Sequence, residues 1–311
     1  MPAALVVQGG ALAVVEPGAA APAWTVPGAV AALDGSAAYR ADGDALVRLD
    51  LRTGEATGRW PLPSGAWHVA VVSPGGQRVV VTDGVLDDAR PPTTTRLALV
   101  DTTRTEPPVE RTLPGALEPE ALSVGGDRVF VLDHRPDYYR VRAVSLGTGA
   151  IDDVFGRDKS AGEDMVGEAV RAVLSPDGTV LATLYREPTG HHPFVHVLHL
   201  ANGWAYCADL PAKPYESIAN TADGRTVYVG AADGSWVSLD LSAFGEPSSD
   251  PLPLADHHGT APPVPLARGG TIVRDRVVVT ADATGVTWSS GGATVGRFDG
   301  PVERLVGLLR A

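Results

Sequence analysis

Ionisable residues recur at one place in a repeated pattern, just ahead of or at the start of short apolar segments along the chain. At such positions a histidine or a glutamate can act as an acid or a base, and an arginine can anchor an anion. The same residue types can also ligate a metal ion, or can be solvated charges that pair as glutamate–arginine bridges. The fold decides between these roles, since it sets which side chains meet. The residues are His68, Glu118, Glu120, Glu168, Arg171 and Glu216.

Three aromatic residues accompany this set and are further candidates for ligand binding. Trp67 directly precedes His68, and Tyr138 and Tyr139 end a short polar segment at 134–139. Exposed aromatic residues on a flat surface are typical of protein-binding sites. An open pocket above the ionisable residues would instead be typical of an enzyme.

Histidine pairs are the candidates for a metal site. His191 and His192 lie in one segment and His257 and His258 in another, so the pairs could meet only if their loops fold inward. Zinc sites use three or four clustered ligands at short spacing. We therefore predict no cofactor, and keep a divalent metal at these histidines as the alternative. His196 and His199 cannot share a metal, because an offset of three places them on opposite faces of a strand.

Established catalytic motifs are absent from the sequence. It contains no Gly-x-Ser-x-Gly, no phosphate-binding P-loop and no His-Glu-x-x-His stretch. Cys207 is the single cysteine, which excludes an internal disulfide and a cysteine-ligated cluster. We expect its thiol to be buried and unreactive.

The apolar segments that carry the ionisable residues belong to an internal repeat. Each unit reads as a short apolar strand, a turn rich in Gly and Asp, and a second apolar strand, as in "AVLSPDGTVLATL" from Ala172. Successive turns are separated by 41 to 52 residues, and a four-stranded propeller blade takes roughly 40–50. Each unit continues with two more alternating strands, such as "ALVRLDLRTG" from Ala45. The turns are marked by Asp34, Gly75, Gly125, Asp177, Asp223 and Asp275.

Six complete units leave both chain ends over. Residues 3–27 match strands B, C and D of a further unit without a strand A, and residues 302–311 read as a strand A alone. Joining them pairs two sheet edges that would otherwise be exposed. The sequence therefore predicts an all-β, seven-bladed β-propeller as a single domain over 1–311, with one C-terminal and three N-terminal strands in the closing blade.

The repeat resembles the superfamily of YVTN-like and WD40-like propellers, whose blades often carry a turn like "SPDG", here Ser175 to Gly178. The resemblance covers essentially the whole chain and implies the fold. It implies no single function, because such propellers include scaffolds, receptors, lactonases and lyases. The Gly-His and Trp-Asp signature of WD40 repeats is absent, so the chain departs from the scaffold family of that name.

Long loops fall on one predicted face. The A–B and C–D turns are short, whereas the connections that hold insertions are B–C and D–A loops. Binding residues concentrate on loops that a rigid scaffold positions, so we predict that the long-loop face, with the channel mouth, is the functional face. The insertions are 85–95, 134–139, 156–168, 186–194 and 254–270.

Charge and hydropathy restrict the partners. The net charge of −12 makes nucleic acid an improbable partner, because its phosphates require a basic surface. No apolar run approaches the ~20 residues that span a bilayer, and the first residues lack the basic region of a secretory signal. We expect a cytoplasmic monomer with no membrane partner. Lysine is scarce beside arginine, which indicates a GC-rich and plausibly actinobacterial genome.

Two functions follow from these observations. The first is a ligand- or protein-binding propeller that takes a small molecule or a protein on the long-loop face. The alternative is an enzyme of lactonase, hydrolase or lyase type with a polar active site at the mouth of the central channel.

Overall fold

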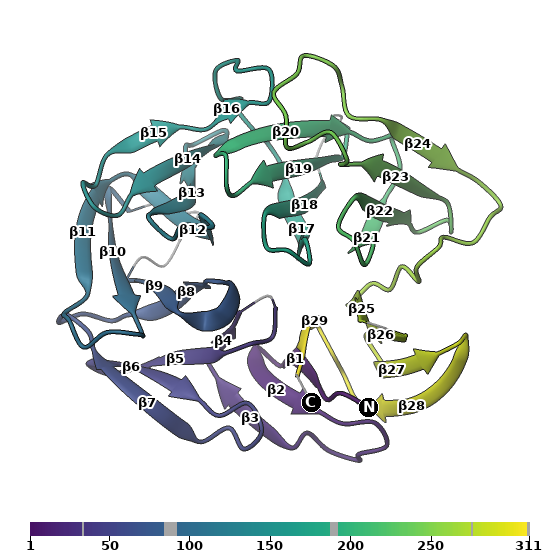
Figure 1. The fold of residues 1–311 in the computed structure, drawn as a ribbon, viewed down its shortest axis with the longest axis horizontal. Helices are drawn as coiled ribbons and strands as arrows, with labels where there is room; N and C mark the ends of the chain where they lie inside the picture. Colours follow the sequence, from purple (N-terminus) through teal and green to yellow (C-terminus); the bar gives the residue numbers. More distant parts are fainter. Residues whose placement is uncertain (33, 84–91, 187–191, 275, 310–311) are drawn as a thin grey trace.

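A ring of seven small β-sheets forms the protein in a computed structural model, which describes residues 1–32, 34–83, 92–186, 192–274 and 276–309 (Figure 1). Six sheets have four strands and one has five. Neighbouring strands pair antiparallel, except that β16 (Phe155–Gly156) pairs parallel with the outer strand of its sheet, and the inner strand of each blade faces the centre of the ring. The predicted seven-bladed β-propeller is confirmed.

The first three blades follow the predicted repeat from about residue 30. Blade 1 consists of β4 (Val30–Ala31), β5 (Ala38–Asp42), β6 (Ala45–Leu49) and β7 (Ala56–Pro61). Blade 2 consists of β8 (His68–Val72), β9 (Arg78–Thr82), β10 (Thr94–Asp101) and β11 (Val109–Pro114), with the short 3₁₀ helix η1 (Pro74–Gly76) in its first turn. Blade 3 consists of β12 (Ala116–Leu122), β13 (Arg128–His134), β14 (Tyr139–Ser145) and β15 (Ile151–Asp153).

The next three blades complete the repeat. Blade 4 consists of β17 (Glu168–Leu174), β18 (Val180–Arg186), β19 (Phe194–His199) and β20 (Trp204–Asp209), with β16 (Phe155–Gly156) added at its outer edge. Blade 5 consists of β21 (Tyr215–Asn220), β22 (Thr226–Ala231), β23 (Trp236–Asp240) and β24 (Leu254–His257). Blade 6 consists of β25 (Gly270–Arg274), β26 (Val277–Asp282), β27 (Gly285–Ser290) and β28 (Ala293–Asp299).

Both chain ends share the closing blade, as predicted. Its strands are β29 (Arg304–Leu308), β1 (Ala4–Gln8), β2 (Ala11–Val15) and β3 (Trp24–Pro27), in that order from the centre outwards. Strand β29 pairs antiparallel with β1, with Ala4 opposite Leu308 and Val7 opposite Arg304. The shared blade removes the two sheet edges that an open ring would expose.

The repeated turn owes its sequence to a hydrogen bond that recurs in four blades. The hydroxyl of a serine or threonine at the first turn position accepts the backbone N–H five residues later, at the start of the second strand. This bond holds the ends of strands A and B at a fixed separation. The four residues are Ser73, Ser123, Ser175 and Thr221.

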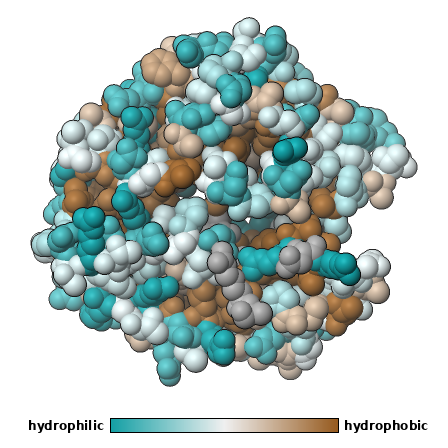
Figure 2. Space-filling model, viewed as in Figure 1, coloured by the Kyte–Doolittle hydropathy of each residue, from teal (hydrophilic) through white to brown (hydrophobic). Residues whose placement is uncertain are grey.

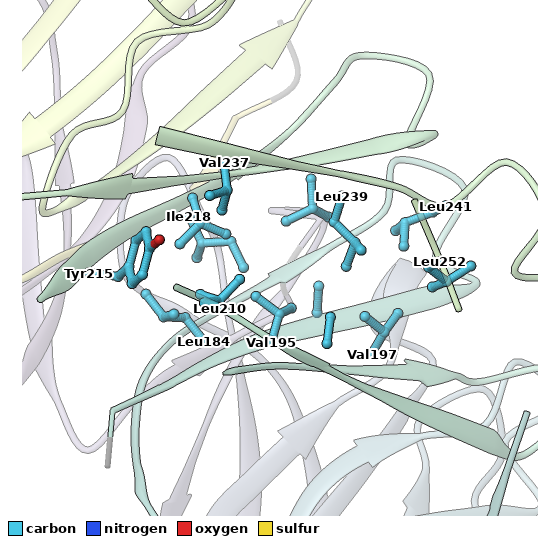
Figure 3. Close-up of a cluster of buried hydrophobic side chains, with 14 of the residues drawn as sticks. Leu184, Val195, Val197, Leu210, Tyr215, Ile218, Val237, Leu239, Leu241 and Leu252 are labelled. Atoms are coloured by element: carbon cyan, nitrogen blue, oxygen red, sulfur yellow. The ribbon is translucent and has the colours of Figure 1, made fainter. Parts of the chain in front are cut away.

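The hydrophobic core is divided into clusters between neighbouring blades. The cluster between blades 4 and 5 joins Leu184 and Val197 to Ile218 and Leu239 (Figure 3). Comparable clusters lie between every other pair of neighbours except blades 5 and 6, where the described residues form no buried hydrophobic cluster. Within the described residues, no helix has the length and apolar character needed to cross a membrane.

The segment 156–168 corrects one part of the predicted loop arrangement. Its first residues belong to the outer edge of blade 4, where Phe155 lies opposite Trp204 at the start of β20. Arg157 is buried and donates to the backbone carbonyls of Ala243, Glu246 and Asp250, in the C–D turn of blade 5. This insertion therefore begins on the side of the short turns, where the carbonyls of that turn bind Arg157. Only its end returns to the long-loop side.

Candidate functional site

A cavity of about 1140 Å³ occupies the central channel. Its walls are the inner strands of blades 4, 5, 6 and the closing blade, and it reaches the A–B turns at Pro74 and Pro176. Figure 2 shows this face of the molecule hollowed at its centre, with brown apolar residues beside teal polar ones. The other end of the cavity, towards the long loops, is formed by Arg171, Gly270 and Arg304.

Arg171 reaches across the channel from blade 4. Its Nη1 donates to the carbonyl of Gly269 over 2.9 Å, and its Nη2 lies 3.3 Å from the carbonyl of Glu303. Its Nε is buried and has no partner among the described residues. Burial and the neighbouring Arg304 lower the pKa of Arg171 to about 10. The residue predicted as an anion anchor thus lines the cavity, with its guanidinium partly engaged by two backbone carbonyls.

Arg304 begins the inner strand of the closing blade and lines the same cavity. Its guanidinium makes no hydrogen bond and no ion pair within the described part of the chain. Enclosure by the channel walls lowers its pKa, and Glu303 only partly offsets this. Two like charges therefore lie close together at one end of the cavity.

A second polar region lies between blades 3 and 4 and contains three of the predicted residues. Glu118 and His134 are 2.9 Å apart, between Oε2 and Nε2. The ring of His134 lies 5.8 Å from that of Tyr139, which in turn lies 5.8 Å from the ring of Tyr185. The structure thus brings Glu118 and Tyr139 together with two residues that the sequence did not single out.

Glu120 completes this second region. Its Oε1 accepts the hydroxyl of Thr183 over 3.2 Å, whereas its Oε2 is buried without a partner among the described residues. Burial raises the pKa of Glu120 to about 7, an effect that the nearby Glu118 reinforces and Thr183 opposes. The phenol oxygens of Tyr139 and Tyr185 are also buried without a partner in the described residues. With a pKa of about 7, the carboxyl group of Glu120 is partly protonated near neutral pH.

The remaining ionisable candidates, His68, Glu168 and Glu216, each interact with a different neighbouring residue. His68 starts β8, and burial lowers its pKa while Asp83 partly restores it. Glu168 pairs with Arg186 over 3.0 Å. Glu216 lies 4.0 Å from Arg268. None of these contacts among the described residues joins His68, Glu118, Arg171 and Glu216 into one cluster, so the four-residue site stays a prediction.

The other aromatic candidates take different positions. Trp67 is buried, donates from Nε1 to the carbonyl of Pro63, and lies 4.8 Å below the guanidinium of Arg96. Tyr138 is half-buried with Arg140 at 5.6 Å over its ring. Trp67 is therefore built into the interface of blades 1 and 2, whereas Tyr138 remains accessible on the long-loop side.

Among the described residues, the histidines predicted to form pairs contact different partners. His257 ends β24, stacks at 3.7 Å on Trp236, and lies 3.0 Å from the hydroxyl of Ser238. His258 lies 3.2 Å from Asp256. His192 is exposed, and His191 lies outside the described residues. No group of three potential metal ligands of the His, Cys, Asp or Glu type is found within the described ranges.

A smaller cavity of about 140 Å³ lies between blades 3 and 4, under the segment 156–163. Cys207 and His196 face each other across β19 and β20 and both line it. Burial and Glu163 raise the pKa of Cys207, which keeps the thiol neutral, as predicted for an unreactive cysteine. His196 faces blade 3, and His199 contacts Phe244 of blade 5, which confirms that they lie on opposite faces.

Four residues of these regions were not singled out from the sequence: Arg304, His134, Thr183 and Tyr185. Arg304 carried a usable signal, since it stands at the start of an inner strand exactly where the other ionisable candidates stand. His134, Thr183 and Tyr185 lie on second strands, where nothing in the alternating pattern distinguishes a polar residue of an interface from one on a free face.

Comparisons with known proteins support the fold. No family model matches the chain, and no curated protein matches its sequence. Hydrazine synthase from Kuenenia stuttgartiensis shares 14% identity at a TM-score of 0.56, over 92% of this chain and 91% of that one. A functionally unknown protein from Desulfotomaculum acetoxidans shares 13% identity at a TM-score of 0.56, over 99% and 98%.

A third solved structure, itself a β-propeller domain, is also similar. The β-propeller domain of Cps50 (Swd1) from Myceliophteria thermophila shares 12% identity at a TM-score of 0.52, over 89% of this chain and 87% of that one. These likenesses confirm the predicted β-propeller fold.

Proposed function

We propose that the protein is a small-molecule-binding β-propeller whose ligand lies in the central channel. The observation that carries this proposal is the cavity of about 1140 Å³ between the inner strands of four blades. Pockets for drug-sized ligands have volumes of about 300–1,000 Å³, so the channel has room for such a molecule. Polar side chains line both ends of the channel, with Arg171 and Arg304 at one end and Asp34 and Asp177 at the other, and such groups can orient a ligand.

Access to the cavity is proposed from the face of the A–B turns. The cavity reaches that face at Pro74, Pro176 and Thr221, whereas Arg171 crosses the channel at the long-loop end. The long-loop face, which the sequence favours, remains the proposed surface for a protein partner, and accessible Tyr138 lies on it.

Ala172 offers a direct test, because it lines the cavity and its side chain is exposed there. Ala172→Trp should fill the channel without disturbing the clusters between blades. A small-molecule library would be screened by thermal shift against the natural protein, Ala172→Trp, and the control Ala150→Trp at an exposed turn of blade 3. Compounds that stabilise the natural protein and the control but not Ala172→Trp support the proposal; their absence contradicts it.

Acid–base catalysis of the lactonase, hydrolase or lyase type is the second candidate function. Glu120 favours it, because a carboxyl with a pKa of about 7 can both donate and accept a proton at neutral pH. Glu120→Gln should then abolish turnover of a lactone and ester panel while preserving any stabilisation by channel ligands. Turnover that survives this substitution would exclude Glu120 as the acid or base.

A further inference from the structure

Arg171 and Arg304 differ from the protein's other arginines in their surroundings. They are the two arginines in the described ranges whose pKa is lowered, mainly by burial, and both line the same cavity. By contrast, Arg96 is paired with the carboxylates of Asp83 and Glu110 at 2.5–3.0 Å. In a protein of net charge −12, two guanidinium groups beside one cavity, neither in an ion pair with a carboxylate among the described residues, indicate an anionic partner that does not belong to the chain.

The carboxylates nearest to the cavity are committed to other contacts. The Oε1 of Glu303 lies 3.2 Å from the backbone nitrogen of Gly10, and only the carbonyl of Glu303 faces Arg171. Asp34 accepts the N–H groups of Ser36 and Gly75 at the opposite end of the cavity. The acidic group that would complete the arginine pair must therefore come from a ligand.

Part of the wall beyond the arginines is apolar. Ala172, Val173, Ile272 and Val273 follow one another along β17 and β25, line the cavity, and are left partly or fully exposed. Exposed apolar side chains along an enclosed channel are stabilised when a ligand covers them, at about 25 cal/mol for each Å² of apolar surface. The cavity thus combines a cationic end with an apolar strip along β17 and β25, beside polar residues such as Asn220 and Arg274.

We propose that the channel binds an organic acid with an apolar body, its carboxylate between Arg171 and Arg304 and its body against the walls of β17 and β25. This inference rests on the proposed function and specifies the class of ligand. A carboxylate suits the site because guanidinium groups present paired N–H donors to its two oxygens.

Straight-chain carboxylates provide the test, with hexanoate, octanoate and decanoate measured by isothermal titration calorimetry. Affinity should rise with chain length, since each buried methylene contributes about 0.8 kcal/mol. The matched alcohol should bind ten- to a hundred-fold more weakly, because hydrogen bonds to charged groups are worth about 1.5–3 kcal/mol. Inorganic phosphate and sulfate should bind far more weakly than decanoate, because neither covers the apolar walls.

Variants locate the binding. Arg304→Met and Arg171→Met should each weaken decanoate binding at least ten-fold, and Ala172→Trp should abolish it. Arg304→Lys should retain part of the affinity, since it keeps the charge. Arg104→Met, at an exposed turn of blade 2, is the matched control and should bind normally.

The outcomes separate the two proposals. If the alcohol binds as well as the acid, and Ala172→Trp blocks both, the channel is a binding site but the acid inference is wrong. If decanoate binds equally well to Arg304→Met and Arg171→Met, the inference is also wrong. If no acid binds, it is overturned as well, and the library screen then decides the fate of the channel. If Ala172→Trp leaves every binding event unchanged, the channel proposal itself fails.

Discussion

The interface between blades 4 and 5 and the interface between blades 5 and 6 are built on opposite faces of the same sheet, yet they are packed differently. The first buries a large apolar cluster that includes Val197, Val229 and Leu239 (Figure 3). The second has no such cluster among the described residues. In Figure 1 a long connection from β24 to β25 joins the two blades on either side of this second interface.

Strand alternation explains the difference. In β22 and β23 the residues that face blade 4 are valines and leucine, whereas their neighbours facing blade 6 include Thr226, Tyr228 and Ser238. On the facing side of blade 6, strand β27 carries Thr287 and Ser289. Since successive side chains point to opposite faces, the same strands can be apolar towards one neighbour and polar towards the other.

The two interfaces show that neighbouring blades of one ring can differ in how much buried apolar surface holds them together. Blade 6 is attached mainly through its other face, where Val279, Val286 and Trp288 pack against the closing blade. The indole of Trp288 also donates to the carbonyl of Pro2. The channel cavity lies beside the weaker joint, lined by the inner strands of blades 5 and 6. An interface without a buried apolar cluster among the described residues and an open channel thus occur in the same part of the ring.

Deletion of residues 302–311 should have the largest effect, because it removes the attachment of blade 6 as well as the inner strand of the closing blade. Val302, Leu305, Val306 and Leu308 are all buried, and each loses about 1.5–3 kcal/mol of burial. The sum is comparable to the whole stability of a typical domain, about 5–15 kcal/mol. We expect an insoluble protein or a large loss of melting temperature. A truncated protein that melts like the full chain would refute the closure.

Leu239→Ala should have the next largest effect, since it opens a cavity in the well-packed interface of blades 4 and 5. Leu239 is fully buried, and such truncations cost about 3–5 kcal/mol. Urea denaturation with an unchanged slope would measure this loss. A cost below about 1 kcal/mol would show that this interface is not the strong one.

Glu120 should make stability depend on pH at the neighbouring interface of blades 3 and 4. Its pKa of about 7 exceeds the usual 4.5, so between these values the folded protein keeps a proton that the unfolded chain has lost. Stability therefore falls as pH rises from about 4.5 to 7, by about 3 kcal/mol in total. Urea denaturation at pH 5 and pH 8 should show this fall in the natural protein and little of it in Glu120→Gln. Equal pH dependence in both would assign it to other groups.

The fold could be predicted from the sequence because its determinants are local and repeated. Ser175 and Thr221 mark turns that recur at blade spacing, and the unmatched ends of the chain required the closing blade. Arg171 was found for the same reason, since counting from a turn places a residue along an inner strand.

The contacts of the site could not be predicted, because they cross between blades that the repeat does not relate. The approach of Arg171 to Glu303 joins residues 132 positions apart. The raised pKa of Glu120 depends on burial, which the sequence pattern does not reveal. The position of 156–163 was wrong because one buried side chain, Arg157, decides it.

Leu266→Ala should have the smallest effect and is the sharpest test of the comparison, since it removes the same atoms as Leu239→Ala from the weaker joint. Leu266 belongs to the connection between blades 5 and 6, is half-buried, and lies over Gly230, where an added Cβ would approach its Cβ to 3.0 Å. A partly exposed leucine loses little burial and leaves no enclosed cavity when truncated, so the cost should stay below about 1 kcal/mol. Urea denaturation beside Leu239→Ala measures the ratio directly. If the two truncations cost the same, the connection packs blade 6 as firmly as the apolar cluster packs blade 4, and the unequal-joint account fails.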